Sequence, residues 1–181
     1  TKAATTEELA FVLNNLESLQ PGGKCVAIVP LSCAIGESKT IGDLKRRLLE
    51  SHTLEAVMSM PTDLFYDSDV GVVTCIMVFT AHRPHGGKKT WFGHWTDDKF
   101  VKVKNKGRVD KFNKWNETKN FWVTTFMNRD VISGYSLTHT VTAEDEWCVE
   151  AYMETDYSKL TEADFVGVVK NFIAYEFLKG R

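Results

Sequence analysis

The sequence lacks any long hydrophobic run, since no segment approaches the ~20 consecutive apolar residues that a membrane-spanning helix requires. Its first residues, TKAATTEELAF, also lack the basic-then-apolar order of a secretion signal. With 43% hydrophobic and 25% charged residues in 181, the composition is that of an ordinary soluble globular protein and excludes the disordered and fibrous classes. We therefore expect a cytoplasmic protein of one domain, or of one domain with a sizeable extension.

Cysteine is scarce and widely spaced. The four cysteines form no C-x-x-C pair, and three of them lie within or beside apolar runs, so we expect buried free thiols rather than disulfides or zinc ligands. They are Cys25, Cys33, Cys75 and Cys148. His82 and His85 have no cysteines nearby, and we expect no metal site there.

Several signature motifs are also missing. The sequence contains no G-x-G-x-x-G, no G-x-x-x-x-G-K-S/T and no G-x-S-x-G. Asp63, Asp67 and Asp69 are spaced like part of a calcium loop, but the glycine and glutamate that should follow are absent, so turn formation explains them better. The acid-rich segment 145–156 fits a solvated helix face better than a nuclease-like carboxylate cluster.

The most informative stretch is LEAVMSMPTDLFYDSDVGVVTCIMVF, residues 54–79. It contains two apolar runs, typical of strands covered on both faces, on either side of a turn-rich loop. That loop carries Leu64, Phe65 and Tyr66. Two roles are open for its aromatic rings: both fold back over the core, or one faces a planar ligand.

The preceding residues predict a helix, a strand and a second helix. Apolar residues recur at helical spacing up to about Leu19, the run 24–30 is a strand by composition, and a helix over 41–52 is capped by Ser38 or Thr40. We expect this helix to turn Lys45, Arg46 and Arg47 to water. As it forms a crossover, the strands 24–30 and 54–60 should be parallel.

The strand at 70–80 should run antiparallel to its neighbours, because the connection 60–70 is too short for another crossover. It could lie between the strands 24–30 and 54–60 or outside them. A three-stranded piece that begins with a helix has an unpaired edge along the strand 24–29, which is an exposed apolar strand. The carboxyl ends of the parallel strands are where ligands of such sheets bind, so the loops 30–36 and 61–69 are the ones to reach a ligand.

After Thr80 the character of the sequence changes, and a polar loop over 81–89 suggests a boundary at residue 82. We expect a hairpin of 90–95 with 99–104, a helix over 113–127, an irregular strand over 131–141, a helix over 146–153 and a last helix from Thr161.

The charges of this second part are segregated. Eleven Lys/Arg stand against four acids in 83–119, a net charge of +7, whereas one lysine stands against eight acids in 144–164, a net charge of −7. Aromatic residues interleave the basic segment, which suits a surface that follows phosphates and stacks bases. Candidate contacts to the DNA backbone are Lys102, Lys104, Lys106 and Arg108. Alternatively, the two segments neutralise each other within one fold and the aromatics are core.

The order of elements and the residues together resemble a known family. The succession EELAFVLNNLESLQPGGKCVAIVP, a charged helix ending LKRRLLE, and LEAVMSMPTDLFYDSDVGVVTCIMVF is similar to the second half of the catalytic domain in N6-adenine DNA methyltransferases. The resemblance is in particular to the modification (M) subunits of type I restriction-modification systems, and it covers residues 7–80 closely. The later part looks like the extension that follows the catalytic domain in some of these subunits.

The resemblance implies a fold and a substrate contact. Residues 1–82 would be the C-terminal half of a Rossmann-like methyltransferase sheet, an α/β fold, and 83–181 an α+β extension, basic over 83–119, then acidic and helical over 143–181. The strands 24–30, 54–60 and 70–80 would be the fifth, sixth and seventh, in spatial order five, seven, six. In the family an aromatic before the last strand packs against the flipped adenine; the matching residue is Phe65, with Tyr66 adjacent.

Two family elements have no counterpart in this sequence. They are the glycine-rich cofactor turn and the catalytic Asn or Asp followed by Pro-Pro and an aromatic; the only prolines are at 21, 30, 61 and 84. We therefore expect no catalytic or cofactor-binding residue here and interpret the chain as the C-terminal part of such an enzyme, truncated or split and inactive alone. S-adenosylmethionine would serve the parent enzyme and is not expected to bind this chain alone.

The partners implied are DNA, the N-terminal part of the same enzyme, and the specificity and restriction subunits. A different hypothesis is a non-catalytic module that binds DNA or assembles subunits through the basic segment. A third is that the exposed strand 24–29 pairs with its copy in a second chain, giving a homodimer.

Overall fold

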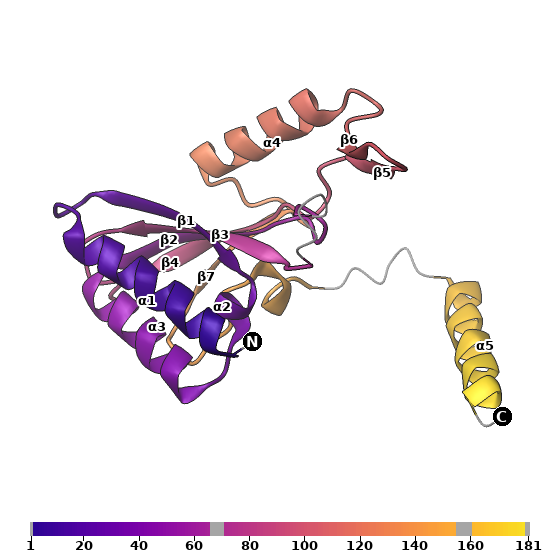
Figure 1. The fold of residues 1–181 in the computed structure, drawn as a ribbon, viewed down its shortest axis with the longest axis horizontal. Helices are drawn as coiled ribbons and strands as arrows, with labels where there is room; N and C mark the ends of the chain where they lie inside the picture. Colours follow the sequence, from indigo (N-terminus) through magenta and orange to yellow (C-terminus); the bar gives the residue numbers. More distant parts are fainter. Residues whose placement is uncertain (1, 66–70, 155–160, 180–181) are drawn as a thin grey trace.

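The computed structural model describes residues 2–65, 71–154 and 161–179. Within these residues a five-stranded sheet has the order β1-β3-β2-β4-β7, and β5 and β6 form a separate pair (Figure 1). The strands are β1 (Lys24–Pro30), β2 (Thr53–Ser59), β3 (Thr74–Thr80), β4 (Lys89–His94), β5 (Val101–Val103), β6 (Gly107–Val109) and β7 (Ser136–Thr140). The helices are α1 (Lys2–Ser18), α2 (Ser32–Ile35), α3 (Lys39–Ser51), α4 (Trp115–Asn128), α5 (Glu162–Lys179) and the 3-10 turn η2 (Val149–Ala151).

The sheet is mixed. β3 lies between β1 and β2 and is antiparallel to both, so β1 and β2 run parallel, as the crossover through α3 requires. β4 then adds parallel to β2, and β7 adds antiparallel to β4. The strands on either side of residue 82, β3 and β4, therefore belong to the same sheet.

One face of the sheet is covered by α1 and α3, which lie side by side (Figure 1). The apolar residues of α1 recur at helical spacing, so Leu9, Val12, Leu13 and Leu16 all face this core. Ser38 caps α3, because its hydroxyl oxygen accepts the backbone N–H of Ile41 at 3.3 Å. The expected cap and crossover helix are thus confirmed.

Lys45 of α3 does not face water, contrary to expectation. Its ammonium donates to the backbone oxygens of Ala34 at 2.6 Å and Asp145 at 3.0 Å, and lies 5.1 Å from the centre of the Trp147 ring. Burial lowers the pKa of Lys45 because it disfavours the charged form. The long side chain of Lys45 thus joins helix α2 to the segment around Asp145, a contact that sequence periodicity does not reveal.

The other face carries a second core beneath α4, which lies on the opposite side of the sheet from α1 (Figure 1). Three tryptophans meet here: Trp91 on β4, Trp95 just after β4, and Trp122 on α4. The rings of Trp95 and Trp122 stack, with their centres 5.2 Å apart and an interplanar angle of 4°. The helix expected over 113–127 is therefore present. Much of the aromatic content of the basic segment is core, which is the simpler of the two roles considered for it.

The hairpin expected for 90–95 and 99–104 does not form. Trp91 and Phe92 are both buried and face the two opposite cores, so β4 must have a covered surface on each side and joins the main sheet. β5 pairs instead with β6, through a turn in which Asn105 has a positive φ of 62°.

The helix expected over 146–153 is reduced to the 3-10 turn η2. The hydrogen bonds expected at the start of this helix are present: the Asp145 carboxylate accepts both the N–H and the hydroxyl of Thr142, at 2.7 and 2.8 Å. However, the consecutive residues Trp147, Cys148 and Val149 are all buried, and one face of a helix cannot bury three residues in a row.

All four cysteines are free thiols, as predicted. Three are buried, and burial raises the pKa of Cys33 to about 12 and that of Cys148 to about 11. In the described ranges no helix combines the length and the apolar character needed to cross a membrane. The last helix, α5, lies apart from the sheet and buries none of its side chains (Figure 1).

Candidate functional site

Two loops leave the sheet at one edge. β2 and β4 are parallel, and Ser59 and His94, the last residues of these strands, are in register, so the segments 60–65 and 95–100 start side by side. The backbone N–H of Trp95 continues the ladder by donating to Ser59 O at 2.9 Å. Ligands of open α/β sheets bind at the carboxyl ends of parallel strands, so this edge is the candidate site.

The first loop carries Phe65. Pro61 is buried, the N–H of Leu64 donates to Pro61 O at 3.3 Å to close a turn, and Phe65 is half-buried at the end of that turn. Tyr66 lies outside the described residues. The Phe65 ring is therefore neither a fully buried core ring nor a free surface side chain.

Arg108, a predicted DNA contact, is held inside a network of carboxylates. One terminal nitrogen donates to both oxygens of Asp98 at 2.8 Å, and Nε lies 3.1 Å from Oδ1 of Asp63 in the Phe65 loop. The Arg108 and Asp98 side chains are only 9% and 8% exposed. Lys102 reaches Oδ2 of the same Asp63 at 3.3 Å.

Lys104 and Lys106 are arranged differently from Lys102 and Arg108. Both lie in the turn between β5 and β6, both are exposed, and neither forms an ion pair with a described residue. The four predicted backbone contacts thus divide into two that bind carboxylates of the chain itself and two that face solvent.

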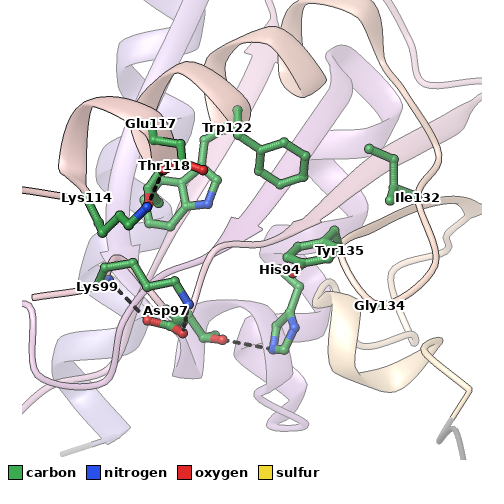
Figure 2. A pocket seen from close by; sticks show the side chains of 12 residues that line it. His94, Asp97, Lys99, Lys114, Glu117, Thr118, Trp122, Ile132, Gly134 and Tyr135 are labelled. Carbon is green, nitrogen blue, oxygen red and sulfur yellow. Dashed lines mark hydrogen bonds and ion pairs between the residues drawn. The ribbon is translucent and has the colours of Figure 1, made fainter. Parts of the chain in front are cut away.

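A cavity of about 630 Å³ opens beside His94, between α4 and the segments that flank β4 and β7 (Figure 2). Its aromatic side includes Trp122 and Tyr135, and its polar side includes Asp97 and Lys99, which form an ion pair. The hydrogen bond that the Lys99 ammonium donates to the Asp97 carboxylate lowers the pKa of Asp97 and raises that of Lys99, so both groups are charged at neutral pH. The lining residues are His94, Thr96, Asp97, Lys99, Lys114, Glu117, Thr118, Phe121, Trp122, Ile132, Gly134 and Tyr135.

A serine, a histidine and a glutamate meet at this edge, although they lie far apart in the sequence. The Ser59 hydroxyl donates to Oε2 of Glu150 at 2.7 Å, while Nε2 of His94 is 3.8 Å from Oε1 of Glu150 and 3.2 Å from the Thr96 hydroxyl. In a hydrolytic triad the hydroxyl is bound to the imidazole instead. This cluster therefore ties η2 to the sheet rather than activating a nucleophile.

The sequence of this chain is similar to those of other proteins. The sequence matches the family model described as N-6 DNA Methylase over residues 1–176. The type II restriction enzyme and methyltransferase RM.BcgI of Heyndrickxia coagulans is 30% identical over 171 residues, which cover 94% of this chain and 26% of that protein. The type I restriction enzyme StySJI methylase subunit of Salmonella typhimurium is 27% identical over 111 residues, 60% of this chain and 20% of that subunit.

Among solved structures, the type I restriction-modification methyltransferase subunit of Streptococcus thermophilus has a TM-score of 0.63 at 16% identity, covering 81% of this chain and 30% of that one. At this identity the likeness shows the fold alone. The matched residues span about a quarter of the length of RM.BcgI and a fifth of that of the StySJI subunit. Because the family match extends over nearly the whole sequence, the chain belongs to the N-6 DNA methylase family.

Proposed function

We propose that this chain forms the target-adenine side of a site-specific N6-adenine DNA methyltransferase of a restriction-modification system, acting on DNA in the cytoplasm. The observation that carries the proposal is the position of Phe65, half-buried in a loop at the carboxyl edge of the sheet, in a chain of the N-6 DNA methylase family. In this proposal β1, β2 and β3 are the fifth, sixth and seventh strands of a Rossmann-like methyltransferase sheet. The insertion of antiparallel β3 between the other two supports that assignment.

The residues of this chain do not fit S-adenosylmethionine. Of the described strands, β1 is followed by Leu31 and the short helix α2, and β2 by the Pro61 turn; neither connection is glycine-rich. The sequence also has no Asn-Pro-Pro or Asp-Pro-Pro element. We therefore assign no step of methyl transfer to this chain. The cofactor and the catalytic residues belong, in this proposal, to the N-terminal part of the same enzyme.

What this chain contributes is a contact to the base. A base inside a duplex must be turned out of the stack before its exocyclic nitrogen can react, which costs a few kcal/mol of stacking and pairing. An aromatic ring that packs on the extruded base recovers about 1–3 kcal/mol of this cost. Phe65, with Tyr66 next to it in sequence, is the side chain that we assign to this role.

Phe65→Ala is expected to reduce kcat/KM for DNA methylation by about 10- to 100-fold, since one stacking contact is lost. The change should be measured by methyl transfer to duplex DNA in the methyltransferase that contains this chain. Phe65→Tyr retains the stacking face and serves as the matched control, with a change of less than about threefold. Wild-type activity in the alanine variant would mean that the Phe65 ring only packs over the core and does not contact the base.

A second function, DNA binding or subunit assembly without catalysis, is favoured by two observations. The segment 83–119 has a net charge of +7, and α5 exposes apolar residues along its length, among them Phe165, Phe172, Ile173 and Phe177. An uncovered apolar helix fits a subunit interface. We propose that α5 binds the specificity or restriction subunit of such a system.

Removal of both exposed turn lysines, Lys104→Ala with Lys106→Ala, is expected to weaken DNA binding equally for all sequences. Each phosphate contact adds about 0.9 to the slope of log K against log salt, so the slope should fall by about 2. A gel shift titrated with salt measures it. Arg47→Ala, on the α1 and α3 face, is the control with an unchanged slope. If the lysine variant keeps the wild-type slope, these lysines do not contact DNA.

The outer edge of β1 is a further surface that needs a partner. This edge pairs with no described strand, whereas the other edge of β1 pairs with β3. Val26 and Ile28 of β1 are 66% and 59% exposed. We propose that the N-terminal part of the enzyme covers this edge, or that the edge pairs with its copy in a second chain.

In sedimentation experiments on this chain alone, we expect a dimer that forms with rising concentration. Ile28→Lys should abolish it by adding charge to the edge. A monomer at every concentration of the unaltered chain would exclude the homodimer and leave the N-terminal part as the occupant.

A further inference from the structure

We propose that Arg108 is a positioning residue that fixes the loop Pro61–Phe65 by binding Asp63 of the loop and Asp98 of the neighbouring segment at once. The inference rests on the proposed function, in which Phe65 contacts the target adenine. It assigns to this arginine a role within the protein in place of a contact to the DNA backbone.

Asp98 is the fixed point of the arrangement. It lies four residues after the end of β4, in the segment that Trp95 joins to the end of β2 by its hydrogen bond to Ser59 O. Its Oδ1 accepts the backbone N–H of Phe100 at 3.0 Å, and both of its oxygens accept from Arg108 at 2.8 Å. A carboxylate with this many donors, 8% exposed, has little freedom to move.

Arg108 connects the fixed carboxylate of Asp98 to the loop. It is on β6, opposite Lys102 of β5, and cross-strand partners project from the same face of a hairpin. Accordingly both cations reach Asp63, with Nε of Arg108 at 3.1 Å from Oδ1 and the Lys102 ammonium at 3.3 Å from Oδ2. Only a guanidinium can serve two carboxylates through separate, fixed nitrogens.

The two cations are not equivalent. Arg108 is 9% exposed, whereas Lys102 is 49% exposed, so water screens the attraction of Lys102 for Asp63 much more. The guanidinium also lies 5.4 Å from the centre of the Phe100 ring, which restricts it further. We infer that the Arg108 contact dominates the position of Asp63.

Asp63 is two residues from Phe65, so fixing this carboxylate limits the positions that the ring can take. A loop that is ordered before DNA binds loses less conformational entropy when the adenine is turned out. Breaking the contact should therefore reduce the population of extruded base and raise KM for DNA, while the affinity for S-adenosylmethionine stays unchanged.

The test compares amide hydrogen exchange of residues 60–65 in this chain and in Asp63→Asn. That variant removes the loop partner but leaves Arg108 with Asp98, so it avoids exposing an unpaired buried charge. We expect exchange in the loop to rise about tenfold, as for loss of one ion pair to a nearly buried guanidinium. Asp43→Asn breaks the exposed pair of Asp43 with Arg46 on α3 and is the matched control, with no change in the loop. Arg108→Lys should raise loop exchange like Asp63→Asn.

A second measurement separates the two proposals. In the methyltransferase that contains this chain, 2-aminopurine at the target position reports extrusion of the base by its fluorescence. Faster loop exchange in Asp63→Asn together with lost fluorescence in Phe65→Ala supports both proposals. Faster loop exchange in Asp63→Asn with unchanged fluorescence in Phe65→Ala supports the positioning role of Arg108 and contradicts the role of Phe65. Unchanged loop exchange in Asp63→Asn and Arg108→Lys overturns the inference about Arg108, whatever the fluorescence.

Discussion

Trp91→Ala is expected to lower the free energy of unfolding by about 3–5 kcal/mol, the usual cost of deleting a buried tryptophan. The Trp91 ring is buried between β4 and α4, with edge contacts to Trp95 at 6.2 Å and Phe126 at 5.7 Å between ring centres. Its indole N–H donates to Asp130 O at 2.9 Å, just beyond the end of α4. The change would remove the packing and the hydrogen bond together.

Neighbouring rings cannot fill the resulting cavity, because Trp95 is already stacked on Trp122. Unfolding in denaturant, followed by near-UV circular dichroism, measures the loss. Trp91→Phe is the control: it keeps an aromatic ring in the cavity and should cost about 1–2 kcal/mol through the hydrogen bond and the smaller volume. A loss below about 1 kcal/mol for the alanine variant would show that α4 contributes little to the stability of the sheet.

Asp98→Ala is the second change for which we expect a large effect, a loss of about 3–5 kcal/mol, because it leaves the guanidinium of Arg108 buried without its main counter-ion. Asp97→Ala is the matched control next to it. Its carboxylate is 69% exposed and paired with Lys99 at the surface, where such pairs contribute about 0–1 kcal/mol.

The combination of Asp98→Ala with Arg108→Met sharpens this prediction. Once both charges are gone, the buried guanidinium no longer lacks its main counter-ion, so the double variant should be more stable than Asp98→Ala alone. Thermal and denaturant unfolding of the variants completes the cycle. A double variant that loses the sum of the two single losses would mean that the residues do not interact, contrary to the 2.8 Å contacts.

The sequence pattern was informative where contacts are local. The helical spacing in α1, the Ser38 cap of α3 and the direction of β3 all depend on residues close in the chain, or on the length of a connection. The pairing of β4 with β2 is different. β2 and β4 are separated in sequence by β3. The alternation of apolar and polar residues in β4 does not by itself distinguish an inner strand of a sheet from one strand of a hairpin.

The candidate site shows the same division. Phe65 was identified through a resemblance to a family, and the exposed turn lysines, Lys104 and Lys106, through composition. The partners of Arg108 were missed because Asp63 and Asp98 come from two other loops, and a lysine or arginine count does not distinguish a solvated cation from one that binds carboxylates. The buried ammonium of Lys45 was missed for a similar reason, since its partners are backbone carbonyl oxygens, which any residue supplies.

The stability of helix α5 depends on what surrounds the protein. An isolated helix of 18 residues gains little from its own hydrogen bonds, and this one recovers nothing from burial within the described chain. Under the proposed binding of α5 to a subunit, the stability of this helix is set by mass action: a partner at a hundred times its dissociation constant adds about 2.7 kcal/mol. Chains made in excess of that partner keep an apolar segment in water, where proteases and aggregation act on it first. Under the same proposal, subunit balance, rather than sequence alone, determines how long each copy survives.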